Sequence, residues 1–256
     1  MEILIKDFII VLMLFVRILA AFMAAPVFGH KAVPTIIKIF LSFFIAYILF
    51  STLDTSHIIV EDTPAFLVTN VLKEVVTGLI IGFTFNLVFH GITFAGSLIG
   101  FDVGLSMASV LDPINDTQSN VISEMIFYLA LFVFFLIDGH HHVIKALYSS
   151  VMIIPVGKYT INQTVYDMLI RYAGSVFIIA IKIASPILVS FFLIHVAEGI
   201  LARVIPQMQV FFVTQPLKIG VGMVMLSFLV PTYIYLIKNL LDMYEENLYQ
   251  LIKAMG

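Results

Sequence analysis

The sequence predicts an all-α, hydrophobic membrane protein of about six long helices, some of them kinked or folded into hairpins. Of its 256 residues, 61% are hydrophobic and only 11% are charged, and the mean hydropathy is +1.11. Soluble domains are about 45–50% apolar and about 25% charged. Five or six apolar stretches reach the roughly 20 residues that a membrane-spanning helix needs. The period-2 alternation of membrane β-barrels is absent from the sequence.

The expected helices follow one another along the whole chain. The first contains Arg17, has no basic segment before it and is too long for a signal peptide, so we expect it to be retained. The third and the last exceed one span and are expected to contain a kink or a hairpin turn, with Gly91 and Pro231 as candidate breaks. The segments lie near residues 8–29, 36–53, 71–101, 121–138, 173–202 and 209–240.

Short connectors with turn residues separate these helices. Residues 51–64 are acidic, residues 111–120 combine Asp, Pro, Asn and Gln, and residues 154–167 form a third loop. The sequence contains no soluble segment of domain size, no long linker and no clear internal repeat. We therefore expect a single helical domain over residues 1–256.

Composition and motifs disfavour several classes of function. The absence of cysteine excludes thiol chemistry and cysteine metal sites, and a net charge of −3 without a basic tail makes nucleic acid an unexpected partner. The sequence has no catalytic triad, phosphate loop or paired carboxylates, so we expect no enzyme and no cofactor. His140, His141 and His142 are consecutive, and such side chains point roughly 100° apart on a helix. We therefore expect a partly exposed helix terminus there, without a metal site.

Arg17, Lys182 and Glu198 lie inside apolar segments, where a charge at the bilayer centre costs roughly 2.5–3.5 kcal/mol on insertion scales. One explanation is snorkelling or a buried structural ion pair. A second is that these helices pack in a larger assembly that offers polar partners. A third, a proton or ion relay, would need acidic residues in midspan, and only Glu198 qualifies.

Glycines line one face of the third segment. Gly96, Gly100 and Gly104 are four residues apart, and Gly78 and Gly82 form a second pair, a spacing that lets another helix backbone approach closely. The glycine face leads directly into residues 105–120, which we predict to face or close a pore, because irregular backbone at membrane depth must be buried in protein or line a cavity. Its expected apolar contacts are Leu105, Met107 and Val110, and its polar residues include Asp112, Pro113, Asn115 and Gln118.

Four stretches, in this order over some 220 residues, resemble the FliR family of flagellar export-gate proteins, which is related to the T component of type III secretion systems. Two departures concern Thr214, where the family often has glycine, and the glycine helix, whose polar residues are here Ser97 and Asp102. The matching stretches are FVRILAAFMAAPVFGHKAVPTIIKI, GSLIGFDVGLSMASVLDPINDTQSNVI, FFLIDGHHHVIKALYSSVMIIPVG and LARVIPQMQVFFVTQPLKIGVGM.

The resemblance implies a non-enzymatic subunit of the flagellar type III protein export gate in the bacterial inner membrane and flagellar basal body. Such a subunit joins the P and Q components to form the pore for unfolded flagellar proteins and contacts the B component, a switch protein. Much of the assembled gate would be raised to the periplasmic side, and residues 105–120 would belong to the plug of the pore. The alternatives are a gate subunit of a virulence injectisome or a small-solute secondary transporter, although the inverted repeats of transporters are not evident.

The most distinctive matching stretch contains Arg203, Pro206, Gln207, Val210, Phe211, Pro216, Lys218 and Gly222. We expect residues 203–218 to form the bend between two long helices, because each proline removes a backbone donor. Gln207, Gln209 and Gln215 would satisfy the backbone groups that are freed, and Arg203 and Lys218 would pair with acids on neighbouring chains. The alternative is a plain polar turn at the membrane surface.

Overall fold

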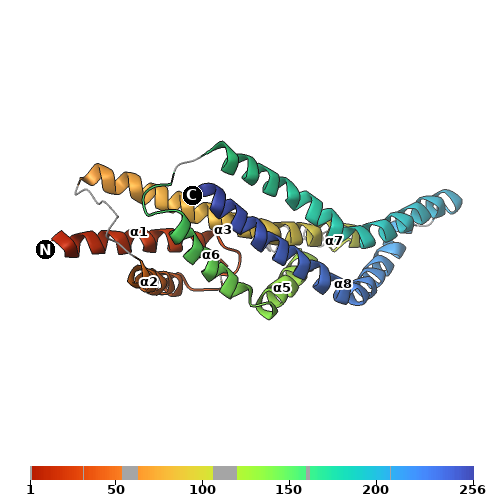
Figure 1. Cartoon of the computed structure of the whole chain (residues 1–256). Coiled ribbons are helices and arrows are strands. Elements are labelled where there is room, and N and C mark those ends of the chain that lie inside the picture. Colours follow the sequence, from red (N-terminus) through yellow and green to blue (C-terminus); the bar gives the residue numbers. More distant parts are fainter. Residues whose placement is uncertain (1, 31, 54–62, 106–119, 160–161, 208) are drawn as a thin grey trace. The chain divides into compact units, whose positions relative to one another are not determined.

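The computed structural model describes residues 2–30, 32–53, 63–105, 120–159, 162–207 and 209–256. These residues form helices and connecting turns, with no strand among them (Figure 1). The helices are α1 (Glu2–Ala24), α2 (Thr35–Thr52), α3 (Pro64–Val103), α5 (Val121–Leu136), α6 (Gly139–Ile153), α7 (Gln163–Val204) and α8 (Val210–Met255).

Five of these helices, α1, α2, α3, α7 and α8, are long and apolar enough to cross a membrane, and α5 with α6 would make a sixth, broken span. The prediction of an all-α membrane protein with about six long apolar segments is therefore confirmed. Within the described residues, α3 runs through Gly91 and α8 through Pro231 without interruption, so neither contains a hairpin turn.

Two helices differ from their predicted extents. Helix α7 begins at Gln163 rather than near residue 173, which shortens the connector predicted at 154–167. Helix α8 continues to Met255 rather than ending near residue 240. Helix α6 was not predicted as a helix of its own, because its first half is rich in histidine and breaks the apolar pattern. The consecutive histidines lie in the first turn of this helix, as expected for a helix terminus.

The described residues group into two compact units, each built from segments that are distant in the sequence. Unit 1 comprises residues 1–87, 138–173 and 242–256. Its core includes five fully buried residues, Leu14, Ile18 and Phe22 of α1 and Tyr244 and Leu251 of α8. Helices α1 and α2 pack through the edge-to-face rings of Phe15 and Phe43, whose centroids are 6.1 Å apart.

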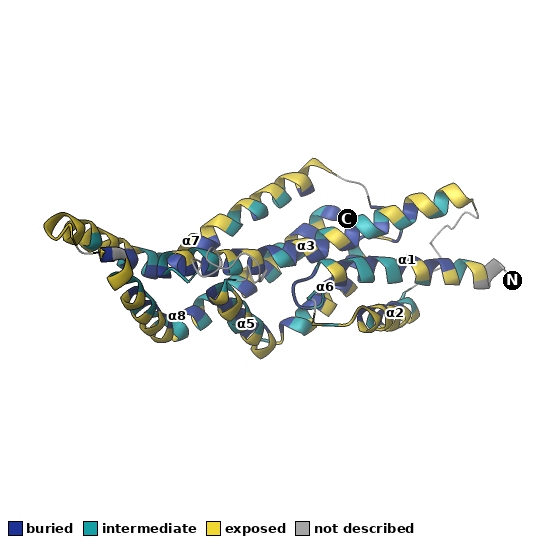
Figure 2. Ribbon diagram, turned by 180° about the vertical axis from the view of Figure 1, so that it is seen from behind, coloured by how far each residue is buried: buried dark blue, intermediate teal, exposed yellow. Residues whose placement is uncertain are grey.

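Unit 2 comprises residues 88–137 and 174–241, which hold the end of α3, all of α5 and most of α7 and α8. Its core includes Ile92 and Ile99 of α3, Ile126 of α5, Phe191 of α7 and Tyr233 of α8. Figure 2 shows that the part of unit 2 where α7 ends and α8 begins is almost wholly exposed. The assignment of residues 1–256 to a single domain stays a prediction.

Candidate functional site: two ion-pair clusters and an apolar helical hairpin

In unit 1, Arg17 of α1 and Glu74 of α3 form a fully buried ion pair, with both side chains 0% exposed. The guanidinium donates from Nε and Nη2 to the two carboxylate oxygens of Glu74, and the Nη2–Oε1 distance is 3.0 Å. A planar guanidinium matches a carboxylate in this two-point geometry. The sequence left several explanations open for a charge at Arg17, and the structure shows a buried ion pair within the chain.

The remaining donors and acceptors of this pair hold a third element in place. Nη1 of Arg17 donates to the carbonyls of Ser150 and Ile154 at the end of α6, each at 3.1 Å. The backbone N–H of Gly157 donates to Oε1 of Glu74 at 2.6 Å. Gly157 adopts a φ of 76°, which favours glycine. One buried ion pair therefore joins α1, α3 and the segment that follows α6.

The glycine pair of α3 in unit 1 lies directly against α1. A Cβ atom on Gly78 would overlap the carbonyl oxygen of Arg17, and one on Gly82 would overlap that of Ala21. The small side chains of Ala20 and Ala24 complete the facing surface. Small residues on both helices allow the backbones to approach closely, which brings Arg17 within reach of Glu74 one turn before Gly78.

Gly96 and Gly100 lie in unit 2, against the beginning of α5. A Cβ on Gly96 would meet the backbone of Ser123 at 2.5 Å, and one on Gly100 would overlap the Asn120 side chain. Asn120 is the N-cap of α5: its Oδ1 accepts from the N–H of Ile122 at 3.1 Å, and its Nδ2 donates to the carbonyl of Ser97 at 3.1 Å. The same amide thus caps α5 and ties it to the glycine face.

Gly104 lies at the end of α3 and not on its helical face. Its φ of 87° is the left-handed conformation that commonly terminates helices, and its N–H donates to the carbonyl of Phe101 at 3.0 Å. Gln215 of α8 donates from Nε2 to the carbonyl of Val103 at 3.4 Å and occupies the space that a Cβ on Gly104 would fill. The sequence suggested that Gln215 satisfies a backbone group freed by a proline. In the structure it contacts the end of α3 instead.

Leu105 is the last described residue after α3 and is partly exposed. The other residues predicted for the plug lie outside the described residues: Met107, Val110, Asp112, Pro113, Asn115 and Gln118.

A second ion-pair cluster joins α7 and α8 in unit 2. Lys218 is 5% exposed, and its Nζ lies 2.7 Å from Oε2 of Glu198. Nδ1 of His195 lies 3.2 Å from both groups. The structure thus gives Lys218 an acidic partner on the adjacent helix of the same chain, and the expected pairing with an acid on a neighbouring chain stays a prediction.

The other predicted charges do not share this burial. Lys182 of α7 and Arg203 near its end are both exposed on this chain, and their burial against another subunit stays a prediction. The connection between α7 and α8 spans only residues 205–209 and holds Pro206 and Gln207, both exposed. Phe211 and Pro216 lie inside α8, so the bend is shorter than predicted.

The hairpin made by the end of α7 and the beginning of α8 exposes many large apolar side chains. Phe228 is 84% exposed, Phe212 71% and Val224 70%. A helix with this much exposed apolar surface belongs in a membrane or inside a larger assembly. Further hairpin residues are exposed by 40% to 69%, namely Leu201, Val196, Ile205, Leu217, Val213, Ile200, Val189, Phe192, Leu193 and Val204.

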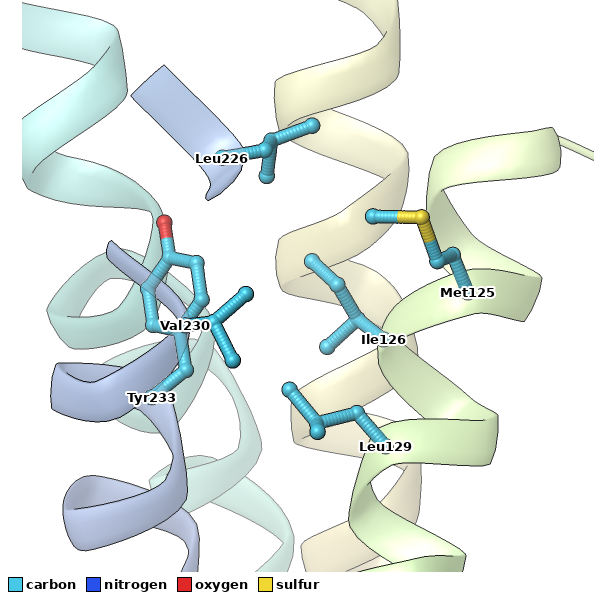
Figure 3. A pocket seen from close by; sticks show the side chains of 6 residues that line it. All are labelled: Met125, Ile126, Leu129, Leu226, Val230 and Tyr233. Carbon is cyan, nitrogen blue, oxygen red and sulfur yellow. The ribbon is translucent and has the colours of Figure 1, made fainter. Parts of the chain in front are cut away.

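A pocket of about 310 Å³ lies between α5 and α8 in unit 2 (Figure 3). The hydroxyl of Tyr233, a residue only 1% exposed, has no hydrogen-bond partner in the described part of the chain. The lining is apolar except for this hydroxyl, so the pocket suits an apolar group. The lining residues are Met125, Ile126, Leu129, Leu226, Val230 and Tyr233.

The sequence analysis missed three side chains that make these contacts, namely Glu74, Asn120 and His195, and it assigned Gln215 a different partner. An acid inside an apolar segment, as at Glu74, was a readable signal of a partner for Arg17. The other three are ordinary polar residues in the sequence, and only the approach of distant helices gives them a role.

Together these features define a helical membrane protein with internal ion pairs and an apolar hairpin that is open to partners. The chain matches the family described as bacterial export proteins, family 1, over residues 8–244. It is 33% identical to the flagellar biosynthetic protein FliR of Bacillus subtilis over 96% of this chain and 95% of the relative. It is 26% identical to the FliR protein of Escherichia coli over 84% and 82%, respectively. The chain therefore belongs to the FliR family of bacterial export proteins.

Proposed function

We propose that this chain is a structural, non-catalytic subunit of the flagellar type III export gate. It is a component of the flagellar export apparatus at the inner membrane, as its family and its apolar helices indicate. In the proposal it joins the P and Q components to form the passage for unfolded flagellar proteins and contacts the B component. Much of the assembled gate would lie on the periplasmic side of the membrane.

The observation that carries the proposal is the exposure of the α7–α8 hairpin. Side chains such as Phe192, Phe212 and Phe228 are exposed on it, whereas the charges of Lys218 and Glu198 neutralise each other within the hairpin. A surface of this kind fits between other apolar helices, which supports a subunit of a helical assembly. The proposal extends this to residues 105–120 as part of the plug that closes the passage.

Arg203 supplies the most direct test of assembly. This side chain is charged, exposed and close to the tip of an apolar hairpin, so the proposal gives it an acidic partner on another subunit. Arg203→Ala should reduce co-purification of the P and Q components and impair swimming. Arg171→Ala, an exposed arginine on α7 in unit 1, is the matched control and should leave both unchanged. Normal co-purification of the Arg203→Ala variant would contradict this contact.

The curated relatives favour the flagellar system over a virulence injectisome, since those described above are named flagellar biosynthetic proteins. Deletion of the gene should therefore abolish flagellar filaments. Loss of effector secretion with normal filaments would favour the injectisome alternative.

A further inference from the structure

We propose that Asp138, His140 and His141, at the start of α6, bind a single transition-metal ion of the Zn²⁺ type. One ligand atom from each residue can be chosen such that all three lie within 4.8 Å of one another. This cluster belongs to unit 1 and is separate from both ion-pair clusters described above. It involves a motif, Asp-Gly-His-His-His, that the proposed export function does not use.

The backbone explains why these neighbours converge. Asp138 has φ 57° and ψ 29° and occupies the N-cap position of α6 without a side-chain capping hydrogen bond, so its carboxylate is not engaged by the helix. Its Oδ1 lies 3.5 Å from Nδ1 of His141. The rings of His140 and His141 have centroids 4.1 Å apart with an interplanar angle of 36°. The two rings therefore lie side by side in the first turn of α6, although consecutive side chains of a helix were expected to diverge.

The donor set fits Zn²⁺ in number and kind. Two imidazole nitrogens and a carboxylate oxygen are ordinary zinc ligands, with bonds of about 2.0–2.2 Å and a water molecule in an open fourth position. Tetrahedral bonds of that length place ligand atoms roughly 3.4 Å apart, so the atoms must close by little more than 1 Å. The side chains of Asp138 and His141 are both 70% exposed and can rotate to do so.

The surroundings predict selective but reversible binding. Imidazole nitrogen favours zinc, copper and nickel over magnesium and calcium. The positive end of the α6 dipole opposes a cation, and the Asp138 carboxylate offsets it. His142 is turned elsewhere, because its Nδ1 pairs with Glu245 of α8. A bound ion would link Asp138 to the first turn of α6 and hold the beginning of that helix in place.

Isothermal titration of the chelator-treated export complex, carrying an affinity tag without histidine, tests the proposal with Zn²⁺ as the probe. The expected result is one saturable site per chain, weakened at least about tenfold by either Asp138→Asn or His141→Ala. His90→Ala changes an exposed histidine in unit 2 and should bind as the wild type does. Mg²⁺ should give no comparable heat.

A structural readout separates this site from unspecific binding. Zn²⁺ should slow amide hydrogen exchange of residues 139–143 in the wild type and not in the two ligand variants. Absence of a saturable site, or equal binding by the wild type and both ligand variants, would overturn the proposal. An adventitious ion only, bound without any effect on exchange at the start of α6, would also overturn it.

Discussion

The substitution Glu74→Ala is expected to destabilise unit 1 strongly. It removes the one carboxylate that pairs with Arg17 among the described residues and leaves a guanidinium that is 0% exposed. The carbonyls of Ser150 and Ile154 still accept from this group, but they carry no full negative charge. The variant thus buries an uncompensated cation and also strands the N–H of Gly157, which donates to Glu74 in the wild type.

The expected magnitude follows from the burial of the pair. Removing one partner of a buried ion pair costs about 3–5 kcal/mol. For a chain of this size, each kcal/mol lowers the Tm by about 2–4 °C, so Glu74→Ala should lower it by roughly 6–20 °C. The double variant Arg17→Met/Glu74→Leu removes both charges and should recover much of this loss. Its recovery should remain partial, because backbone groups that bonded to the pair stay without partners.

Thermal unfolding in detergent, followed by far-UV circular dichroism, measures the stability of Glu74→Ala and of the double variant. Glu124→Ala removes an exposed carboxylate from α5 and serves as the control, with an expected change within about 0.5 kcal/mol. The reasoning would be refuted if Glu74→Ala unfolded at the wild-type temperature. It would equally be refuted if the double variant lost as much stability as Glu74→Ala does.

Three further predictions concern packing and the second cluster. Gly78→Ala should destabilise the protein by about 1–3 kcal/mol through overpacking. Its control is Gly174→Ala, which should be neutral or stabilising because a Cβ there meets nothing within 4 Å. Equal Tm values for the two variants would contradict the close approach of α1 to α3. Gly104→Ala should cost at least about 1 kcal/mol because its φ is 87°, and unchanged unfolding would rule out the left-handed cap. Lys218→Met should cost about 1–3 kcal/mol and slow swimming, with much of the loss restored by Glu198→Gln in the same chain; no rescue in a motility assay would count against the internal pair.

The fold class could be predicted from the sequence, because composition and the length of apolar segments are read without knowing which distant residues are in contact. The sequence also identified Arg17 as a charged residue inside an apolar segment, which can be seen without a structure. It did not identify Glu74 as the partner, which lies 57 positions along the chain. That pairing depends on how closely α1 approaches α3, which the glycines permit but do not specify.

The hairpin illustrates the same difference between local and distant information. Pro206 and Gln207 indicated a connection between two helices, and the structure places them there. Pro216 suggested a wider bend, but it lies in the second turn of α8, where the helix continues beyond it. The internal partner of Lys218 was not predicted, because only the antiparallel approach of α7 and α8 brings Glu198 beside it.

Helix α6 was missed for a local reason. Its N-cap residue Asp138 takes a left-handed conformation, which is uncommon for residues other than glycine, and its first turn is made of histidines. Neither feature resembles an ordinary helix start. The close approach of Asp138 and the neighbouring histidines therefore could not be predicted from the hydrophobic periodicity of the sequence.

The native mass of the tagged chain, expressed with its genomic neighbours and extracted in mild detergent, tests the central claim most directly. The account predicts a complex far above the 28.6 kDa of the chain, containing one copy of it and several copies of small helical partners. A stable monomer or homodimer that remains folded without partners would contradict it and point to a self-sufficient membrane protein.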